Sequence, residues 1–94
     1  MATLHVVSHS PFTDTRLDSC LRILGADDAI LLCGDATYAL RRVDPALAAL
    51  GERVFVLDEG AQARGLTLPA ATGAVDYPGF VELCVRFDRV NTWS

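Results

Sequence analysis

Residues 29–33, Ala29-Ile30-Leu31-Leu32-Cys33, decide the fold of this 94-residue chain. All five side chains are apolar, with no alternation between apolar and polar positions. A strand with this pattern is covered on both faces, which is typical of a central strand in a parallel sheet. The stretch therefore predicts an α/β protein with helices packed against a sheet.

The segment before this strand predicts another strand followed by a helix. Residues 3–7 have the length and composition of a strand. Thr13 or Asp14 is expected to cap a helix that runs to about Leu24 and stops at Gly25. The apolar face of this helix consists of Leu17, Cys20, Leu21 and Leu24.

Two short helices are predicted after the central strand. Asp35 follows a turn at Gly34 and is expected to cap a helix through Leu40. Asp44 and Pro45 have the residue types of an N-cap and a first helical residue, and their helix is expected to end near residue 51.

A third strand is predicted over residues 53–57. Asp58 is expected to cap the next helix, and Glu59 suits the positive end of the helix dipole. Gly65 is expected to close that helix after Arg64. The chain thus contains three successive strand–helix units.

The C-terminal part contains one more helix. Residues 66–74 predict a loop that leads to a brief strand at residues 74–75, and Asp76 is expected to cap the helix that follows. Pro78 is tolerated there because its missing amide lies in the first turn. Residues 89–94 predict either a last edge strand or a segment that docks on a partner. The apolar face of the helix consists of Phe80, Leu83, Cys84 and Phe87.

Alternating strands and helices imply right-handed crossovers and a parallel sheet. We therefore predict a small three-layer α/β sandwich with a mostly parallel sheet of about four to five strands. A chain of this length with 51% hydrophobic residues buries one core, so residues 1–94 are expected to form a single domain. Burial against a partner subunit is useful to a domain this small.

The composition argues against several classes of function. A net charge of −4, with arginine as the only strongly basic residue type, argues against direct nucleic-acid binding. The sequence contains no lysine and no glycine-rich phosphate loop, so nothing in it supports nucleotide binding, and no cofactor is expected. The apolar stretches are too short to span a bilayer, and no signal peptide is visible, so we expect a cytoplasmic protein.

The cysteine and histidine spacing predicts no metal site. The three cysteines are widely separated and form no C-x-x-C pair, which fits reduced cytosolic thiols. His5 and His9 are four residues apart, roughly 13 Å along an extended strand, too far to share one ion.

Motifs at both ends and in the middle of the chain carry a resemblance to a known family. They are Ser8-His9-Ser10-Pro11-Phe12, Leu31-Leu32-Cys33-Gly34-Asp35, Val56-Leu57-Asp58-Glu59, Ala63-Arg64-Gly65-Leu66, Asp76-Tyr77-Pro78-Gly79-Phe80-Val81-Glu82-Leu83 and Asn91-Thr92-Trp93. With these motifs at the expected spacing, nearly the whole chain resembles the TusB/DsrH family.

The resemblance implies a fold of the DsrE/DsrF/DsrH type and a role in sulfur relay. Family members assemble with TusC/DsrF-like and TusD/DsrE-like homologous subunits into hetero-oligomers that exchange sulfur with carrier proteins. The expected function is that of a subunit of a TusBCD-like sulfurtransferase complex, which relays persulfide sulfur for 2-thiouridine formation at the tRNA wobble position. Two alternatives stay open: a DsrH-like subunit of a DsrEFH complex in dissimilatory sulfur oxidation, and a noncatalytic scaffold of either complex.

Cys20 is the candidate sulfur acceptor. Arg16 lies one helical turn before it, where a guanidinium can stabilise a thiolate. The same position belongs to the apolar face of the helix, so packing also explains it. The resemblance supports Cys20, because some DsrH-like members have a cysteine at the matching position while others lack it. The family's persulfide is attributed chiefly to the DsrE/TusD-type subunit, so whether this chain is itself catalytic stays open.

The other two thiols have structural interpretations. Cys33 follows the central strand, at the edge where α/β proteins collect their sites, but no basic residue adjoins it and Asp35 opposes a thiolate. Cys84 lies within an apolar helical stripe and is expected to pack in the core.

The remaining polar and aromatic residues are expected to be structural. Ser8, His9, Ser10 and Asp14 lack the glycine-flanked elbow of a hydrolase and are expected to form a loop and a cap. Tyr77, Phe80 and Phe87 lack a basic surround and fit a core or a subunit interface better than a base-stacking platform. Trp93 is expected to dock on a partner chain, and deletion from Asn91 onward is expected to weaken assembly.

Overall fold

The computed structural model of the chain describes residues 1–42, 44–69 and 72–93. Its strands are β1 (Thr3–Val7), β2 (Ala29–Leu32), β3 (Val54–Leu57), β4 (Gly73–Val75) and β5 (Arg89–Trp93). Its α-helices are α1 (Arg16–Ile23), α2 (Pro45–Ala48), α3 (Asp58–Ala63) and α4 (Tyr77–Arg86). The described residues also form two 3-10 helices, η1 (Gly34–Arg41) and η2 (Gly51–Arg53).

The five strands form one parallel sheet in the order β4-β3-β2-β1-β5. β2 is the central strand, and all four of its residues are buried. In register, Leu31 of β2 lies opposite Val6 of β1 and Phe55 of β3. The predictions of a central apolar strand and of a mostly parallel sheet are confirmed.

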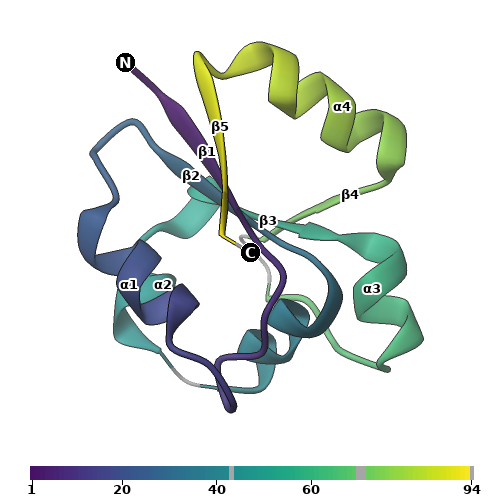
Figure 1. Cartoon of the computed structure of the whole chain (residues 1–94). Helices are drawn as coiled ribbons and strands as arrows, with labels where there is room; N and C mark the ends of the chain where they lie inside the picture. The colour runs from purple at the N-terminus through teal and green to yellow at the C-terminus, as the bar shows by residue number, and fades with distance from the viewer. Residues whose placement is uncertain (43, 70–71, 94) are drawn as a thin grey trace.

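The direction in which the chain crosses the sheet places the helices. From β1 to β4 the chain moves in one direction across the sheet, and from β4 to β5 it returns to the opposite edge. Because such crossovers are right-handed, the reversal places α4 on the face opposite the earlier helices. Figure 1 shows α1, α2 and α3 on one side of the sheet and α4 on the other. The predicted three-layer sandwich is confirmed.

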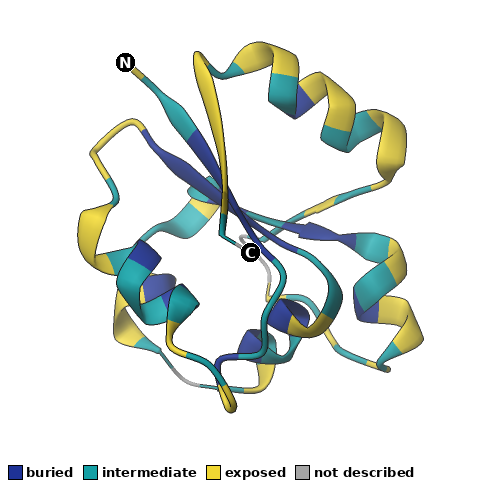
Figure 2. Ribbon diagram, in the orientation of Figure 1, coloured by how far each residue is buried: buried dark blue, intermediate teal, exposed yellow. Residues whose placement is uncertain are grey.

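Each face of the sheet has its own apolar core. One core lies under α1, η1, α2 and α3, and the smaller one lies under α4. Figure 2 shows β1, β2 and β3 buried, while α4 and β5 are largely exposed. The larger core consists of Val7, Leu17, Cys20, Ile30, Leu32, Ala36, Ala39, Leu47, Val54, Val56 and Ala61. The smaller consists of Leu4, Val6, Ala29, Leu31 and Leu83.

The aspartates predicted as helix caps divide into two groups. Asp44 accepts hydrogen bonds from the amides of Ala46 and Leu47, and Asp76 accepts one from the amide of Gly79, so both caps are confirmed. The Asp35 and Asp58 caps are wrong. The Asp35 carboxylate pairs with Arg64, and Asp58 is itself helical and accepts a hydrogen bond from the side chain of Gln62.

The start of α1 differs in detail from its prediction. The first helical residue is Arg16, and its amide donates to the Asp14 carboxylate at 2.8 Å. The N-cap position is Thr15, whose side chain makes no cap hydrogen bond, and Asp14, one residue earlier, satisfies this orphan amide of the first turn instead. Thr13 makes no such contact, so that alternative is wrong.

The C-terminal segment is an edge strand of the sheet. β5 pairs in register with the whole of β1, from Thr3 opposite Arg89 to Val7 opposite Trp93. The edge-strand alternative is thus confirmed for residues 89–93. Residue 94, and residues 70–71 of the predicted loop, lie outside the described part of the chain. None of the helices within the described ranges has both the length and the apolarity that crossing a bilayer requires.

Candidate functional site

The carboxyl ends of β1 and β2 meet where the sequence places Cys33. The Cys33 amide donates to the carbonyl of Val7 at 3.0 Å, and its thiol lies 3.6 Å from the same oxygen. Gly34 then turns with φ of 51°, and a side chain there would approach the Ser8 carbonyl to 3.4 Å. The local sequence thus holds the half-buried Cys33 under the loop that follows β1.

The environment of Cys33 disfavours its thiolate. Burial raises the pKa of this thiol. The Asp35 carboxylate, which was expected to oppose the Cys33 thiolate, pairs instead with Arg64 at 2.9 Å. The same guanidinium lies 5.6 Å from the ring of Tyr38, so its contacts are with Asp35 and Tyr38.

Cys20, the predicted acceptor, lies completely buried between α1 and the sheet. Burial, and after it the negative charge of Asp28, raises the pKa of this thiol to about 12. Arg16, which was expected to stabilise the thiolate, pairs with Asp14 instead. The geometry therefore fits the packing interpretation, and the role of Cys20 as an acceptor stays a prediction.

Cys84 packs against the smaller core together with Phe80 of α4 and Phe87, the C-cap residue of this helix, as the helical stripe predicts. All three cysteines are free thiols. They belong to different elements: Cys20 to α1, Cys33 to the end of β2 and Cys84 to α4. The fold thus brings no pair of them together as a disulfide.

The polar residues after β1 form a loop and a cap, as predicted. Ser8 Oγ lies 3.5 Å from Nδ1 of His9, and Ser10 Oγ accepts from the amide of Phe12 at 3.2 Å. Asp14 is paired with Arg16. Each of these polar side chains thus bonds to a group nearby in the sequence. The serines, His9 and Asp14 do not combine into a serine–histidine–aspartate array.

Sequence reasoning missed a buried polar cluster that His5 forms with Asp28 and Trp93. Nε2 of His5 lies 3.3 Å from the Asp28 carboxylate, and the indole N–H of Trp93 donates to Nδ1 of His5 at 3.0 Å. The one signal in the sequence is a histidine within the apolar strand at residues 3–7. No group of three or more potential metal ligands occurs among the residues that the structure describes.

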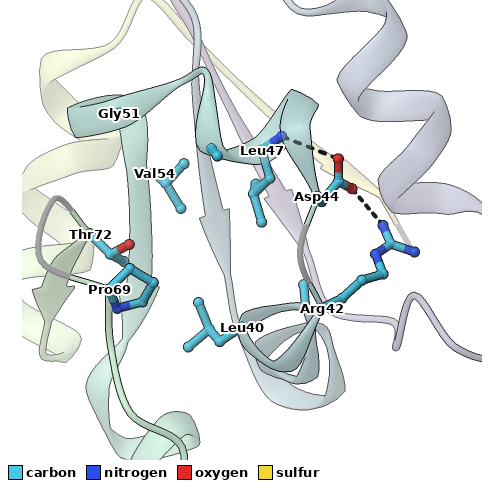
Figure 3. Close-up of a pocket in the computed structure, with 10 residues that line it drawn as sticks. Leu40, Arg42, Asp44, Leu47, Gly51, Val54, Pro69 and Thr72 are labelled. Carbon is cyan, nitrogen blue, oxygen red and sulfur yellow. Dashed lines mark hydrogen bonds and ion pairs between the residues drawn. The ribbon is translucent and has the colours of Figure 1, made fainter.

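An apolar pocket of about 240 Å³ lies between η1, α2 and the residues before β4. Figure 3 shows its lining, with Arg42 at the edge paired to Asp44. Arg42 also pairs with Asp18 at 3.0 Å, so its charge is satisfied. The lining residues include no cysteine or histidine, so the pocket is separate from the thiols. They are Ala39, Leu40, Arg42, Asp44, Leu47, Ala48, Gly51, Val54, Pro69 and Thr72.

Burial and the raised pKa of Cys20 predict that it resists alkylation in the folded chain. With a pKa of about 12, only about one in 10,000 Cys20 thiols is ionised near pH 8. Iodoacetamide is therefore expected to label the half-buried Cys33 and Cys84 first, as peptide mapping by mass spectrometry would show. Raising the pH to about 10 leaves Cys20 mostly protonated and protected.

The matched control is the same reaction in denaturant, where all three thiols are expected to react at similar rates. Labelling of Cys20 in the folded chain at the rate of Cys84 would contradict the closed geometry around α1.

Comparison with known proteins finds a matching family model and matching solved structures. A family model described as "DsrH like protein" matches residues 9–90. No curated protein matches the sequence. A solved structure, "Crystal structure of ychN protein from E.coli", superposes with a TM-score of 0.78 over 99% of this chain and 100% of that one, at 20% identity. At this identity the structural likeness shows the fold alone.

Proposed function

The chain belongs to the DsrH-like family, and from this premise we propose that it is a subunit of a TusBCD-like sulfurtransferase complex. The complex relays persulfide sulfur toward 2-thiouridine formation at the tRNA wobble position. The single observation that carries this proposal is the family match over residues 9–90, which spans nearly all the elements of the fold.

Within that complex we propose a mainly structural role for this chain. A persulfide carrier needs an accessible thiol with thiolate character. Cys20 is completely buried, and the pKa values of both Cys20 and Cys33 are raised. These properties support a structural role, in which this chain completes the assembly and a TusD/DsrE-like subunit carries the sulfur.

The exposed face of α4 supports assembly with partner subunits. Tyr77, Val81 and Val85 follow one another at every fourth position, and their exposed fractions are 56%, 61% and 81%. Residues four apart lie on one face of a helix. An apolar row of this kind suits burial against a homologous subunit of TusC/DsrF or TusD/DsrE type.

For the alternative in which this chain itself accepts sulfur, we propose Cys20 as the acceptor thiol. Transfer to it requires α1 to move from the sheet in the assembled complex, because the side chain is inaccessible in the folded chain. The presence of a cysteine at this position also favours the second candidate function, a DsrH-like subunit of a DsrEFH complex in sulfur oxidation.

Deletion of the gene in its host tests the proposal. The expected result is loss of 2-thiouridine from wobble positions, measured by mass spectrometry of digested tRNA, with recovery when the chain is expressed again. A Cys20→Ser chain is expected to restore the modification as well as the wild type, because the role is structural.

Unchanged 2-thiouridine with lost oxidation of reduced sulfur compounds would overturn the tRNA role and establish the DsrEFH-like one. Recovery with the wild type but not with a Cys20→Ser chain that folds and accumulates to the same extent would overturn the structural role.

A further inference from the structure

Among the described residues, three polar side chains are buried: His5, Asp28 and Thr37. Thr37 has a local explanation, since its hydroxyl donates to the carbonyl of Gly34 at 2.8 Å. His5 and Asp28 form a connected cluster with Trp93 that the proposed relay does not use. The cluster joins the start of the chain, the loop before β2 and the end of β5.

The donors of this cluster fix the protonation of His5. An indole N–H is a donor only, so Nδ1 of His5 must accept and carry no hydrogen. Nε2 faces the Asp28 carboxylate and therefore carries the ring hydrogen. The cluster is complete only with a neutral imidazole.

Asp28 is held as an anion. Its carboxylate accepts from the amide of Thr3 at 2.9 Å and from the amide of Gly25 at 2.8 Å. Burial raises the pKa of Asp28, but these two hydrogen bonds and the one with His5 outweigh burial, so the pKa lies below its ordinary value. The carboxylate stays charged while a histidine titrates.

The other elements around His5 bring few charges to it. On α1 the buried titratable group is Cys20, a neutral thiol because its pKa is about 12. The charged groups of α1 are engaged elsewhere or exposed: Arg16 pairs with Asp14, Asp18 pairs with Arg42, and Arg22 is exposed. Ile30 of β2 and Asn91 of β5 lie opposite His5 in register and are uncharged. Arg53 donates to carbonyls of residues 25, 26 and 28, beside the Asp28 loop.

We infer that His5 is a pH-sensitive latch on the C-terminal strand, and that its protonation releases the indole of Trp93 and the end of β5. A proton from solvent adds to Nδ1, the ring nitrogen that carries no hydrogen, in place of its hydrogen bond from the indole, and both ring nitrogens then carry hydrogens. Nδ1–H and the indole N–H become two donors that face each other. Asp28 retains its bond to Nε2.

The position of Trp93 makes the end of β5 the part that opens. β5 is an edge strand whose other four residues are exposed, and among the strands of the described residues it pairs with β1 alone. Trp93 packs partly against the larger core. Without its hydrogen bond, the strand end is held by this packing and by the last rungs of the ladder, and such edges open before the rest of a domain.

Fluorescence of the full-length chain tests the latch, because Trp93 is its only tryptophan. Across the range in which histidine side chains in general change charge, from about pH 8 to about pH 5, we expect one step in which the emission shifts to the red and acrylamide quenching increases several-fold. Far-UV circular dichroism is expected to stay native across the step. A fall in emission without greater acrylamide access would overturn the inference, since a charged imidazole beside a latched indole also quenches.

The chain has two histidines, which makes a matched pair of variants available. His5→Gln keeps an acceptor for Trp93 and a donor for Asp28 but does not titrate, so the step is expected to disappear. His9→Gln is expected to keep it. A step that persists in His5→Gln, or a wild-type emission that is flat over this range, would overturn the latch.

A second measurement on the unaltered chain covers the case in which His5→Gln fails to fold. The indole N–H gives a single proton–nitrogen NMR signal, and we expect it to move with pH in step with the ring signals of His5. An indole signal that stays fixed while His5 titrates, or loss of the native spectrum as a whole in that step, would overturn the inference.

Discussion

A chain truncated after Val90 is expected to have a free energy of unfolding about 3 to 5 kcal/mol below that of the full chain. The truncation removes Asn91, Thr92 and Trp93, which pair with His5, Val6 and Val7 of β1. It also removes the partly buried indole and the hydrogen bond to His5. Since a domain is stabilised by about 5 to 15 kcal/mol in total, this loss is large.

Urea unfolding of the isolated chains measures the difference. Val85→Ala is the control, because Val85 is 81% exposed and its truncation is expected to change stability by less than about 0.5 kcal/mol. Trp93→Phe keeps the ladder and most of the aromatic contact but loses the indole donor, and is expected to cost about 1 to 2 kcal/mol.

Equal stability of the truncated and full chains would contradict the structural role of β5 and would favour a tail reserved for a partner. The earlier expectation that truncation weakens assembly stays a prediction. In the structure it has a further physical cause, because the truncated subunit loses part of its own sheet.

The fold was predictable where one local pattern determines one element. The uninterrupted apolar run at residues 29–33 gave the central strand, and its burial on both faces is what the pattern requires. Asp44 and Asp76 cap helices as predicted, because each has a helix amide within three residues and a proline in the first turn.

Two of the predictions that failed depend on ion pairs. One ion pair joins residues distant in the sequence, and in the other a neighbouring carboxylate takes the guanidinium that was expected to act on Cys20. Asp35 does not cap its helix, because Arg64, 29 residues away, takes its carboxylate. Arg16 does not approach Cys20 as a thiolate partner, because Asp14 lies two residues before it and pairs with its guanidinium. The spacing of residues along a helix predicts neither of these two ion pairs.

The His5 cluster could not be predicted from the sequence. Trp93 lies 88 residues from His5 in the chain, and only the pairing of β5 with β1 brings them together. That pairing depends on the reversal of direction after β4, a property of the whole sheet. The burial of Cys20, by contrast, follows from its place on the apolar face of α1. Packing was one of the two interpretations that the sequence allows for this residue.

Intact mass spectrometry of the assembled complex determines which subunit carries the sulfur. The chain is coexpressed with its TusC/DsrF-like and TusD/DsrE-like partners, purified through a tag on one partner and incubated with a persulfide donor. Cys20→Ser is run in parallel as the matched control. The chain is expected to copurify, because its proposed role is to complete the assembly.

Sulfur is expected to appear on the TusD/DsrE-like partner while the mass of this chain is unchanged, because Cys20 is buried, Cys33 and Cys84 are half-buried, and the pKa values of Cys20 and Cys33 are raised. The Cys20→Ser complex is expected to take up the same sulfur on the same partner. A gain of one sulfur atom on this chain that is absent in Cys20→Ser would contradict the structural role and make the chain a carrier. A complex that takes up no sulfur on any subunit would contradict the relay itself.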